Sequence, residues 1–428
     1  MEKGKNFSLQ DAAELIRRSF PEYSRLADMF TNCMRDTLEK TIRIRPDGSV
    51  FVITGDIPAM WLRDSACQLR PFILFARSDP KILEILVKLV DRQMECILYD
   101  PYANAFNDDG RSFFCMDRTD MKPYLWERKY ELDSLCFPVQ LSYLIWKNTG
   151  CSRQFNQRWL DAVRLILKLF RTEQDHENNS PYTFERENCV YTDTLSRGGK
   201  GALVKGNTGL IWSAFRPSDD ACAYGYLIPS NMLACVILRN IARIAEELYR
   251  DGGLAKEAGA LADEVDAAIR KYACLPGLEE KIFAYEVDGF GQYNVMDDAG
   301  LPSLISLPYI GWCEKTDPAY LSTRKWMLSD RNPYYYSGKV LKGIGSPHTP
   351  GCYVVWPMAL CMQGLTAQDP SEKKEILDML LGSDAGTGMM HEGIDMDNPE
   401  RYTRPWFSWA NSLFCEFLLD LCGVRVEL

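Results

Sequence analysis

Apolar residues recur every three to four positions along most of the chain, a spacing that predicts α-helices. The clearest stripe lies in residues 80–99, where the apolar side chains share one helical face. The same spacing predicts further helices at residues 9–18, 23–39, 66–77, 131–148, 155–171, 232–250, 254–272, 303–313, 318–329, 352–365, 372–381 and 407–422. Most of these helices come in pairs, so the chain is predicted to be mainly helical.

Two regions alternate apolar and polar residues instead, which indicates β-hairpins. Residues 41–45 and 49–54 flank a Pro-Asp-Gly turn, and residues 281–289 and 290–295 form the second candidate. Ser230 follows Pro229 and is predicted to be the N-cap of the helix at 232–250.

Long loops rich in Trp, Tyr, Asp, Arg and Pro separate the helix pairs. A length of 428 residues would by itself suggest two or three domains, but no linker and no repeat of fixed period divides the chain. We therefore expect one domain over residues 1–428. Paired helices with such loops on one side suggest a toroid of inner and outer helices, whose loops converge on a central pit.

Composition narrows the classes of partner. The formal charge is -10 with both signs interspersed, which argues against binding nucleic acid or an anionic membrane. No apolar run approaches the ~20 residues of a membrane span. The sequence leaves the oligomeric state open.

The cysteines and histidines do not form a metal-binding pattern. The 15 cysteines include no Cys-x-x-Cys pair, and several lie in apolar helical stretches as small buried residues. The first eight residues contain no apolar signal core, so we expect free thiols in a cytoplasmic protein. His176, His348 and His391 are far apart, and neither a metal nor another cofactor is expected.

Several loops combine aromatic rings with carboxylate, arginine or histidine side chains, as a carbohydrate pocket requires. Indole and phenol faces pack against the C–H surfaces of sugars, while charged and amide groups bind hydroxyls. Trp61, Trp406 and Trp409 adjoin charges in such loops, although core packing is the ordinary role of a tryptophan.

Acetal hydrolysis needs two carboxyl groups on opposite faces of the sugar ring, one protonated and one ionised. Asp219, Asp220 and Glu392 lie in loops from distant parts of the chain and fit this demand. The alternative is a simple turn in which the two aspartates are solvated or bonded to Arg216. Residues alone do not decide between Asp219 and Asp220 as the acid, or which carboxyl has the raised pKa.

Together, five motifs resemble those of glycoside hydrolase family 125, over essentially the whole chain and in the family's order. They are IPAMWLRDS at 57–65, RPSDD at 216–220, GSPH at 345–348, MHEG at 390–393 and RPWFSW at 404–409. The resemblance implies an (α/α)6 toroid and a metal-free, inverting, exo-acting α-mannosidase that cleaves α-1,6 linkages in oligosaccharides such as N-glycan fragments.

The resemblance also implies roles for particular residues. Asp220 would be the general acid and Glu392 the general base, with Arg63, Asp64 and His348 in contact with the terminal mannose. The composition of the loops adds three residues that would bind the substrate or support those that do: Asp133, Arg216 and Arg404.

Two other classes of function stay open. A sugar epimerase on the same toroid would rely on paired histidines, which three dispersed histidines do not readily supply. A non-catalytic glycan-binding protein would not need carboxyl groups at both 220 and 392. Release of free mannose from α-1,6-mannobiose would separate these classes from a mannosidase.

Overall fold

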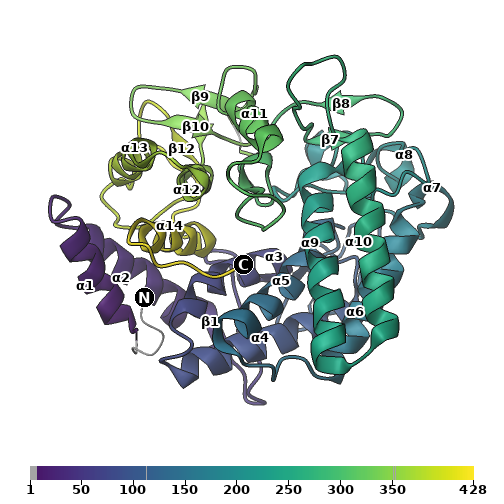
Figure 1. Cartoon of the computed structure of the whole chain (residues 1–428), viewed down its shortest axis with the longest axis horizontal. Coiled ribbons are helices and arrows are strands. Elements are labelled where there is room, and N and C mark those ends of the chain that lie inside the picture. The colour runs from purple at the N-terminus through teal and green to yellow at the C-terminus, as the bar shows by residue number, and fades with distance from the viewer. Residues whose placement is uncertain (1–6, 112, 350, 352) are drawn as a thin grey trace.

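Largely buried helices form an inner layer, and amphipathic helices surround them (Figure 1). The structure is a computed structural model and describes residues 7–111, 113–349, 351 and 353–428. The inner elements are α3 (Leu62–Leu69), α5 (Leu132–Thr149), α9 (Ile228–Ile244), the 3-10 helix η5 (Leu304–Ser306), α12 (Pro357–Thr366) and α14 (Ser408–Leu421). The outer helices are α2 (Leu26–Asp36), α4 (Pro80–Tyr99), α6 (Gln157–Glu173), α10 (Gly252–Tyr272), α11 (Pro318–Met327) and α13 (Pro370–Leu381).

Burial separates the two layers. In α14 all of residues 408–420 are buried, whereas α10 buries only one stripe that includes Leu254, Leu261 and Val265. Helices α9 and α10 lie side by side (Figure 1). A helix that is apolar on every side needs neighbours all around it, and a striped helix needs a neighbour on one face only. The hydrophobic pattern therefore dictates the place of each helix in the layers.

The inner helices begin at one end of the molecule. Arg63, Asp133 and Ser230 lie in the first turns of α3, α5 and α9. Arg63 Nη1 donates to Asp133 Oδ2 at 3.1 Å, and Ser230 Oγ donates to Asp133 Oδ1 at 3.1 Å. Because outer and inner helices alternate along the chain, the loops that lead into the inner helices gather at this end.

Small antiparallel sheets join the segments that lead to the inner helices. The strands are β1 (Ile42–Ile44) with β2 (Val50–Val52), β3 (Met60–Trp61) with β4 (Ala105–Phe106) and β5 (Leu125–Glu127), β6 (Tyr226–Leu227) with β7 (Glu286–Val287) and β8 (Tyr293–Asn294), β9 (Tyr335–Ser337) with β10 (Lys342–Ile344), and β11 (Val354–Val355) with β12 (Ile394–Asp395). Both predicted hairpins are present, and the second is shorter than predicted. The β11–β12 pair places the chain just after His348 beside the chain just after Glu392.

The remaining elements are short or peripheral. They are α1 (Leu9–Ser19), α7 (His176–Asn179), α8 (Ser196–Gly199), the 3-10 helices η2 (Arg70–Leu74) and η3 (Tyr191–Asp193), and the π-helices η1 (Thr37–Thr41) and η4 (Ala245–Tyr249). A continuous cluster of buried apolar residues reaches from Phe7 to Val426. No helix among the described residues is both long enough and apolar enough to cross a membrane.

Three predictions of local structure are wrong. The helix expected at 303–313 is only the short η5, because Pro308 lacks an N–H donor and Gly311 has a φ of +87°. The helix expected at 352–365 begins at Pro357, since β11 occupies the preceding residues; position 352 lies outside the described residues. Ser230 is not an N-cap: α9 already begins at Ile228, and Ser230 binds Asp133 instead.

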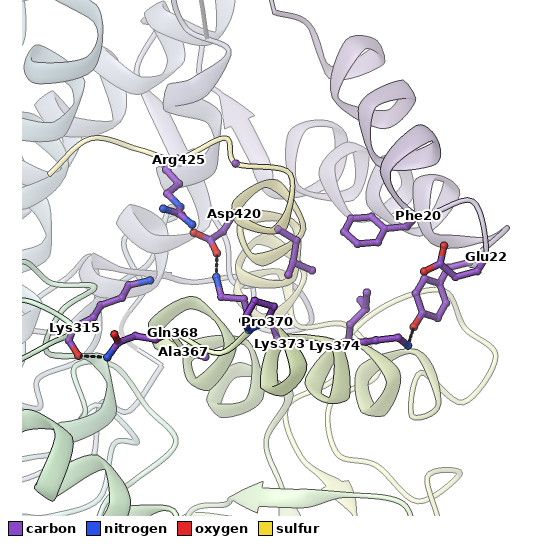
Figure 2. A pocket seen from close by; sticks show the side chains of 14 residues that line it. Phe20, Glu22, Lys315, Ala367, Gln368, Pro370, Lys373, Lys374, Asp420 and Arg425 are labelled. Carbon is purple, nitrogen blue, oxygen red and sulfur yellow. Dashed lines mark hydrogen bonds and ion pairs between the residues drawn. The ribbon is translucent and has the colours of Figure 1, made fainter.

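A cavity of about 700 Å³ lies at the other end of α14, between α13 and the turn that joins α1 to α2 (Figure 2). Its charged groups are largely paired with one another. Asp420 accepts from Lys373 Nζ at 2.5 Å and also pairs with Arg425, and Lys374 Nζ donates to the Tyr23 hydroxyl at 2.7 Å. None of the predicted site residues lines it, so this cavity is separate from the gathered loops.

The contact between α12 and α14 should tolerate no side chain at Gly364. A Cβ there would lie 2.4 Å from the buried Phe417 ring, whereas a Cβ at Gly259 in α10 meets no atom within 4 Å. We expect Gly364→Ala to lower the free energy of unfolding by about 1–3 kcal/mol through overpacking. The matched control, Gly259→Ala, should raise it by about 0.5–1 kcal/mol. Urea unfolding measures both, and equal effects would contradict the tight contact.

Candidate active site

A buried arginine stands where the inner helices begin. The Arg63 side chain is 2% exposed. Its Nη1 donates to Glu131 Oε2 at 2.6 Å and to Asp133 Oδ2 at 3.1 Å. Its Nε lies 3.3 Å from Asp64 Oδ1, and its Nη2 lies 3.9 Å from Asp219 Oδ1. Arg63 is therefore surrounded by carboxyl groups, and the structure places it among them at the base of the gathered loops.

These carboxyl groups differ in pKa because their surroundings differ. Burial raises the pKa of Asp64 to about 6, although Arg63 acts in the opposite direction. Burial likewise raises the pKa of Glu131 well above its usual range. Burial opposes ionisation of Asp219 too. The charge of Lys129, a hydrogen bond from Glu131 and the charge of Arg63 outweigh burial and lower the pKa of Asp219 to about 2. At neutral pH, Asp219 is thus the firmly ionised member of the cluster.

The turn at 216–220 sends its two aspartates to different partners. The Arg216 N–H donates to the Asp220 carbonyl at 2.8 Å, and Asp219 has a left-handed φ of +68°. Asparagine and aspartate adopt this conformation more readily than most residues. Lys129 Nζ donates to the Asp219 carbonyl at 2.8 Å and so stabilises the turn. Asp219 consequently faces Lys129 and Arg63, which leaves Asp220 to face the opposite loop.

Asp220 is paired with His348. Asp220 is 3% exposed, and its Oδ1 lies 3.1 Å from His348 Nδ1. Within the described part of the chain, its other oxygen, Oδ2, has no hydrogen-bond partner. Burial would lower the pKa of His348, but the contact with Asp220 raises it to about 9. The pair therefore holds a proton at neutral pH and keeps one carboxyl oxygen available to a ligand.

Glu392 accepts hydrogen bonds from two neighbouring side chains. It is 8% exposed; its Oε2 accepts from Thr403 Oγ1 at 3.1 Å and its Oε1 from Arg404 Nη1 at 3.4 Å. Arg404 in turn donates from Nη2 to Asp56 Oδ1 at 2.5 Å. The charge of Glu392 also acts on His348, so the two carboxyl groups at 220 and 392 share one neighbourhood.

The three residues added from loop composition make supporting contacts. Arg216 Nε donates to Glu286 Oε1 at 2.5 Å, so its side chain does not pair with the neighbouring aspartates. Asp133 is fully buried between Arg63 and Ser230. Arg404 is the one of the three whose side chain touches a predicted catalytic residue, Glu392.

The tryptophans differ in their surroundings. Trp61 and Trp409 are buried, and among the described residues neither indole N–H has an acceptor. The Arg63 guanidinium lies 5.6 Å from the centre of the Trp409 ring. Trp406 instead donates to Asp36 Oδ2 at 2.6 Å and so binds the outer helix α2.

Sequence reasoning missed several members of the site. Glu131 and Lys129 immediately precede α5 in the same short loop as Asp133, so their closeness to it was a usable signal. Glu286 holds Arg216 from a hairpin 70 residues away, and no local pattern marks that pairing. Among the described residues, no group of three His, Cys, Asp or Glu side chains is arranged to hold a metal ion.

Recessed carboxyl groups at one end of a helical toroid, at 220 and 392 each beside a cationic side chain, are an arrangement that suits a glycoside hydrolase. The structure of a bacterial glucoamylase in complex with acarbose superposes with a TM-score of 0.61 at 12% identity, covering 95% of this chain and 57% of that chain. At that identity the likeness concerns the fold alone, and it confirms the predicted (α/α)6 toroid.

Residues 23–419 match the family described as metal-independent α-mannosidase, glycoside hydrolase family 125. The chain belongs to this family, and the predicted enzyme class, an α-mannosidase, is confirmed. It is 42% identical to the meiotically up-regulated gene 157 protein of Schizosaccharomyces pombe, over 94% of this chain and 83% of that protein. It is also 45% identical to a metal-independent α-mannosidase of Streptococcus pneumoniae in a non-productive complex with α-1,6-mannobiose. That structure has a TM-score of 0.94 and covers 98% of this chain and 100% of that chain.

Removal of the Arg63 charge should destabilise the protein in a pH-dependent way. In Arg63→Gln the clustered carboxyl groups lose their cation, so the folded-state pKa values of Asp64, Glu131 and Asp133, which burial already raises, rise further above the unfolded ones. We expect a loss of about 3–5 kcal/mol at pH 7, typical of a broken buried ion pair. The loss should shrink as the pH falls toward 5, because protonated carboxyl groups no longer repel one another.

The matched control is Arg270→Gln, which removes an exposed ion pair with Asp266 on α10. Its effect should stay within about 1 kcal/mol at both pH values. Denaturant unfolding at pH 7 and pH 5 compares the two variants. A deficit in Arg63→Gln that does not change with pH would mean that packing, and not charge, is the role of Arg63.

Proposed function

We propose that the enzyme is an inverting exo-α-1,6-mannosidase that releases terminal mannose from oligosaccharides such as N-glycan fragments, with Asp220 as general acid and Glu392 as general base. The α-1,6 linkage is supported by the disaccharide bound to the Streptococcus pneumoniae relative. Exo action is supported by burial: Asp220 and Glu392 are less than a tenth exposed, and an internal sugar of a chain would not reach recessed groups.

The observation that carries the proposal is the free Oδ2 of Asp220. A buried carboxyl oxygen that meets no donor or acceptor in the described chain is poised for a group that arrives with the substrate. The other oxygen contacts His348, which shares a proton with the carboxyl group at neutral pH. Asp220 would pass this proton to the glycosidic oxygen as the bond to the leaving sugar breaks.

Glu392 has the surroundings of a base. Arg404 and Thr403 both donate to it, and donors of this kind stabilise the ionised form that must accept a proton from water. In an inverting enzyme the two carboxyl groups stand roughly 6.5–9.5 Å apart to leave room for that water. We propose this wider arrangement for Asp220 and Glu392. Arg63, Asp64 and His348 would contact the terminal mannose.

We also propose that the enzyme works in the cytoplasm. The described cysteines are free thiols, and they include the buried neighbours Cys33 and Cys415. Neighbouring thiols that stay unlinked fit a reducing compartment. A melting temperature that falls when a reductant is added would contradict this location.

Hydrolysis of α-1,6-mannobiose followed by NMR tests the proposed reaction. We expect β-mannose as the first product, because water attacks from the face opposite the leaving sugar. Asp220→Asn should lower kcat/KM on the disaccharide by about 10²–10⁴-fold, with a smaller loss on an aryl mannoside that needs no proton at its leaving group. Glu392→Gln should be inactive on both substrates.

The reverse results have definite meanings. α-Mannose as the first product, or a trapped mannosyl-enzyme on Glu392, would make the enzyme a retaining one. A dead Asp219→Asn beside an active Asp220→Asn would move the acid to the neighbouring residue. Absence of mannose release would favour the glycan-binding or epimerase alternatives.

The proton shared with His348 should set the alkaline limit of activity. The pKa of His348 is raised to about 9, so the pair keeps its proton below that pH and loses it above. We expect kcat/KM to fall with an apparent pKa near this value. In His348→Gln the carboxyl group must hold the proton alone, so the alkaline limb should move down by more than about one pH unit. An unmoved limb would show that His348 does not share the catalytic proton.

A further inference from the structure

An exposed tyrosine stands beside the candidate acid. Tyr191 begins η3 and is 89% exposed, far more than an aromatic ring usually is on a folded surface. Its neighbour in the chain, Thr192, accepts a hydrogen bond from the Ala221 N–H at 2.7 Å. Ala221 directly follows Asp220, so the Tyr191 loop is attached by its backbone to the segment that carries the acid.

Buried charges fix this attachment. Asp193, in the same turn as Tyr191, accepts from Lys129 Nζ at 2.5 Å and from Arg186 Nη1 at 2.9 Å. The same Lys129 ammonium donates to the Asp219 carbonyl at 2.8 Å. One buried cation thus binds both the loop that presents Tyr191 and the turn that presents Asp220. The backbone that carries the exposed Tyr191 ring is therefore held in place, and the ring itself stays uncovered.

A second tyrosine, Tyr334, also lies near Asp220. The Tyr334 carbonyl accepts from the Gly345 N–H at 2.8 Å and so anchors the loop that carries His348. Burial raises the pKa of Tyr334, and the charges of Arg216, Asp298, Tyr191 and Asp220 all act on its hydroxyl. Tyr334 therefore lies near both Asp220 and Tyr191, and the space next to the acid has aromatic neighbours.

The chemistry of the acid says what occupies that space. A general acid donates to the glycosidic oxygen, so the departing sugar must lie on the acid's side of the site. We propose that the exposed Tyr191 ring is the platform on which the leaving-group sugar stacks, and that Tyr191 strengthens binding on the acceptor side of the cleaved bond. This inference rests on the proposed function, with Asp220 as the acid.

An α-1,6-linked leaving sugar is flexible, and an aromatic platform would order it. The extra methylene of a 6-linked sugar adds a rotatable bond, so the leaving sugar takes many orientations unless a surface selects one. A tyrosine face packs against the C–H face of a pyranose and orders it at low entropic cost, since the phenol has only two side-chain torsions. An exposed aromatic face contacts the C–H face of a sugar and selects no particular hydroxyl group. Such a ring would therefore also accept different sugars on the leaving-group side of the cleaved bond.

Two substrates separate the platform from the rest of the site. α-1,6-Mannobiose has a leaving sugar, whereas α-mannosyl fluoride has a leaving group without a ring. In Tyr191→Ala we expect KM for the disaccharide to rise about tenfold, the size of effect of one lost stacking contact, with kcat nearly unchanged. Kinetics on the fluoride should equal those of the unaltered enzyme. Tyr191→Phe should restore the KM, because the ring face remains.

The matched control is Val190→Ala, at a neighbouring side chain that is 68% exposed but offers no ring; it should change neither substrate's kinetics. An unchanged KM for the disaccharide in Tyr191→Ala would overturn the proposal, as would equal losses on both substrates, which indicate a disordered loop. If the unaltered enzyme cleaves another mannobiose and not the α-1,6 isomer, the linkage assignment fails. The same pair of measurements on the cleaved disaccharide then still decides the role of Tyr191.

Discussion

The contact between Arg63 and its carboxylates holds the site end of the ring together. Arg63 starts α3, Asp133 starts α5, and Asp133 reaches on to Ser230 in the first turn of α9. A guanidinium offers five donors in a fixed plane, so it can bind several carboxyl groups that would otherwise repel one another out of water. The same ion that joins the beginnings of three inner helices therefore also fixes where the carboxyl groups stand.

From this cluster follows the division of labour between two adjacent aspartates. The left-handed backbone at Asp219 turns its side chain back toward Lys129 and Arg63, where it stays ionised. Asp220 is left facing His348, with one oxygen unbound among the described groups. Two adjacent residues of the same type thus have different partners. In the proposed function, one of them is a structural anion and the other donates the proton.

Sequence periodicity predicted the helices well where one apolar stripe faces one neighbour. The helix at 80–99 has the predicted bounds, since its pattern is local and complete. The predicted helix at 303–313 failed because Pro308 interrupts it and the ring itself supplies the packing there. The five short motifs contain residues that the structure brings together at one end of the toroid. By contrast, the pairs Arg404 with Asp56 and Arg216 with Glu286 join residues far apart in the chain. Only closure of the ring pairs such groups, so no local pattern could reveal them.

Parallel inner helices explain how a metal-independent family can gather so much negative charge in one place. The inner helices α3, α5 and α9 present their N-terminal ends, with their partial positive charge, to the same group of loops. Arg63, His348 and Arg404 add full positive charges, each against a particular carboxyl group. The fold itself therefore supplies positive charge that offsets the carboxyl groups, as a bound cation does in other sites. It also sets a limit: any change that rotates an inner helix alters the carboxyl groups at its start, so packing deep in the ring and protonation at its mouth depend on each other.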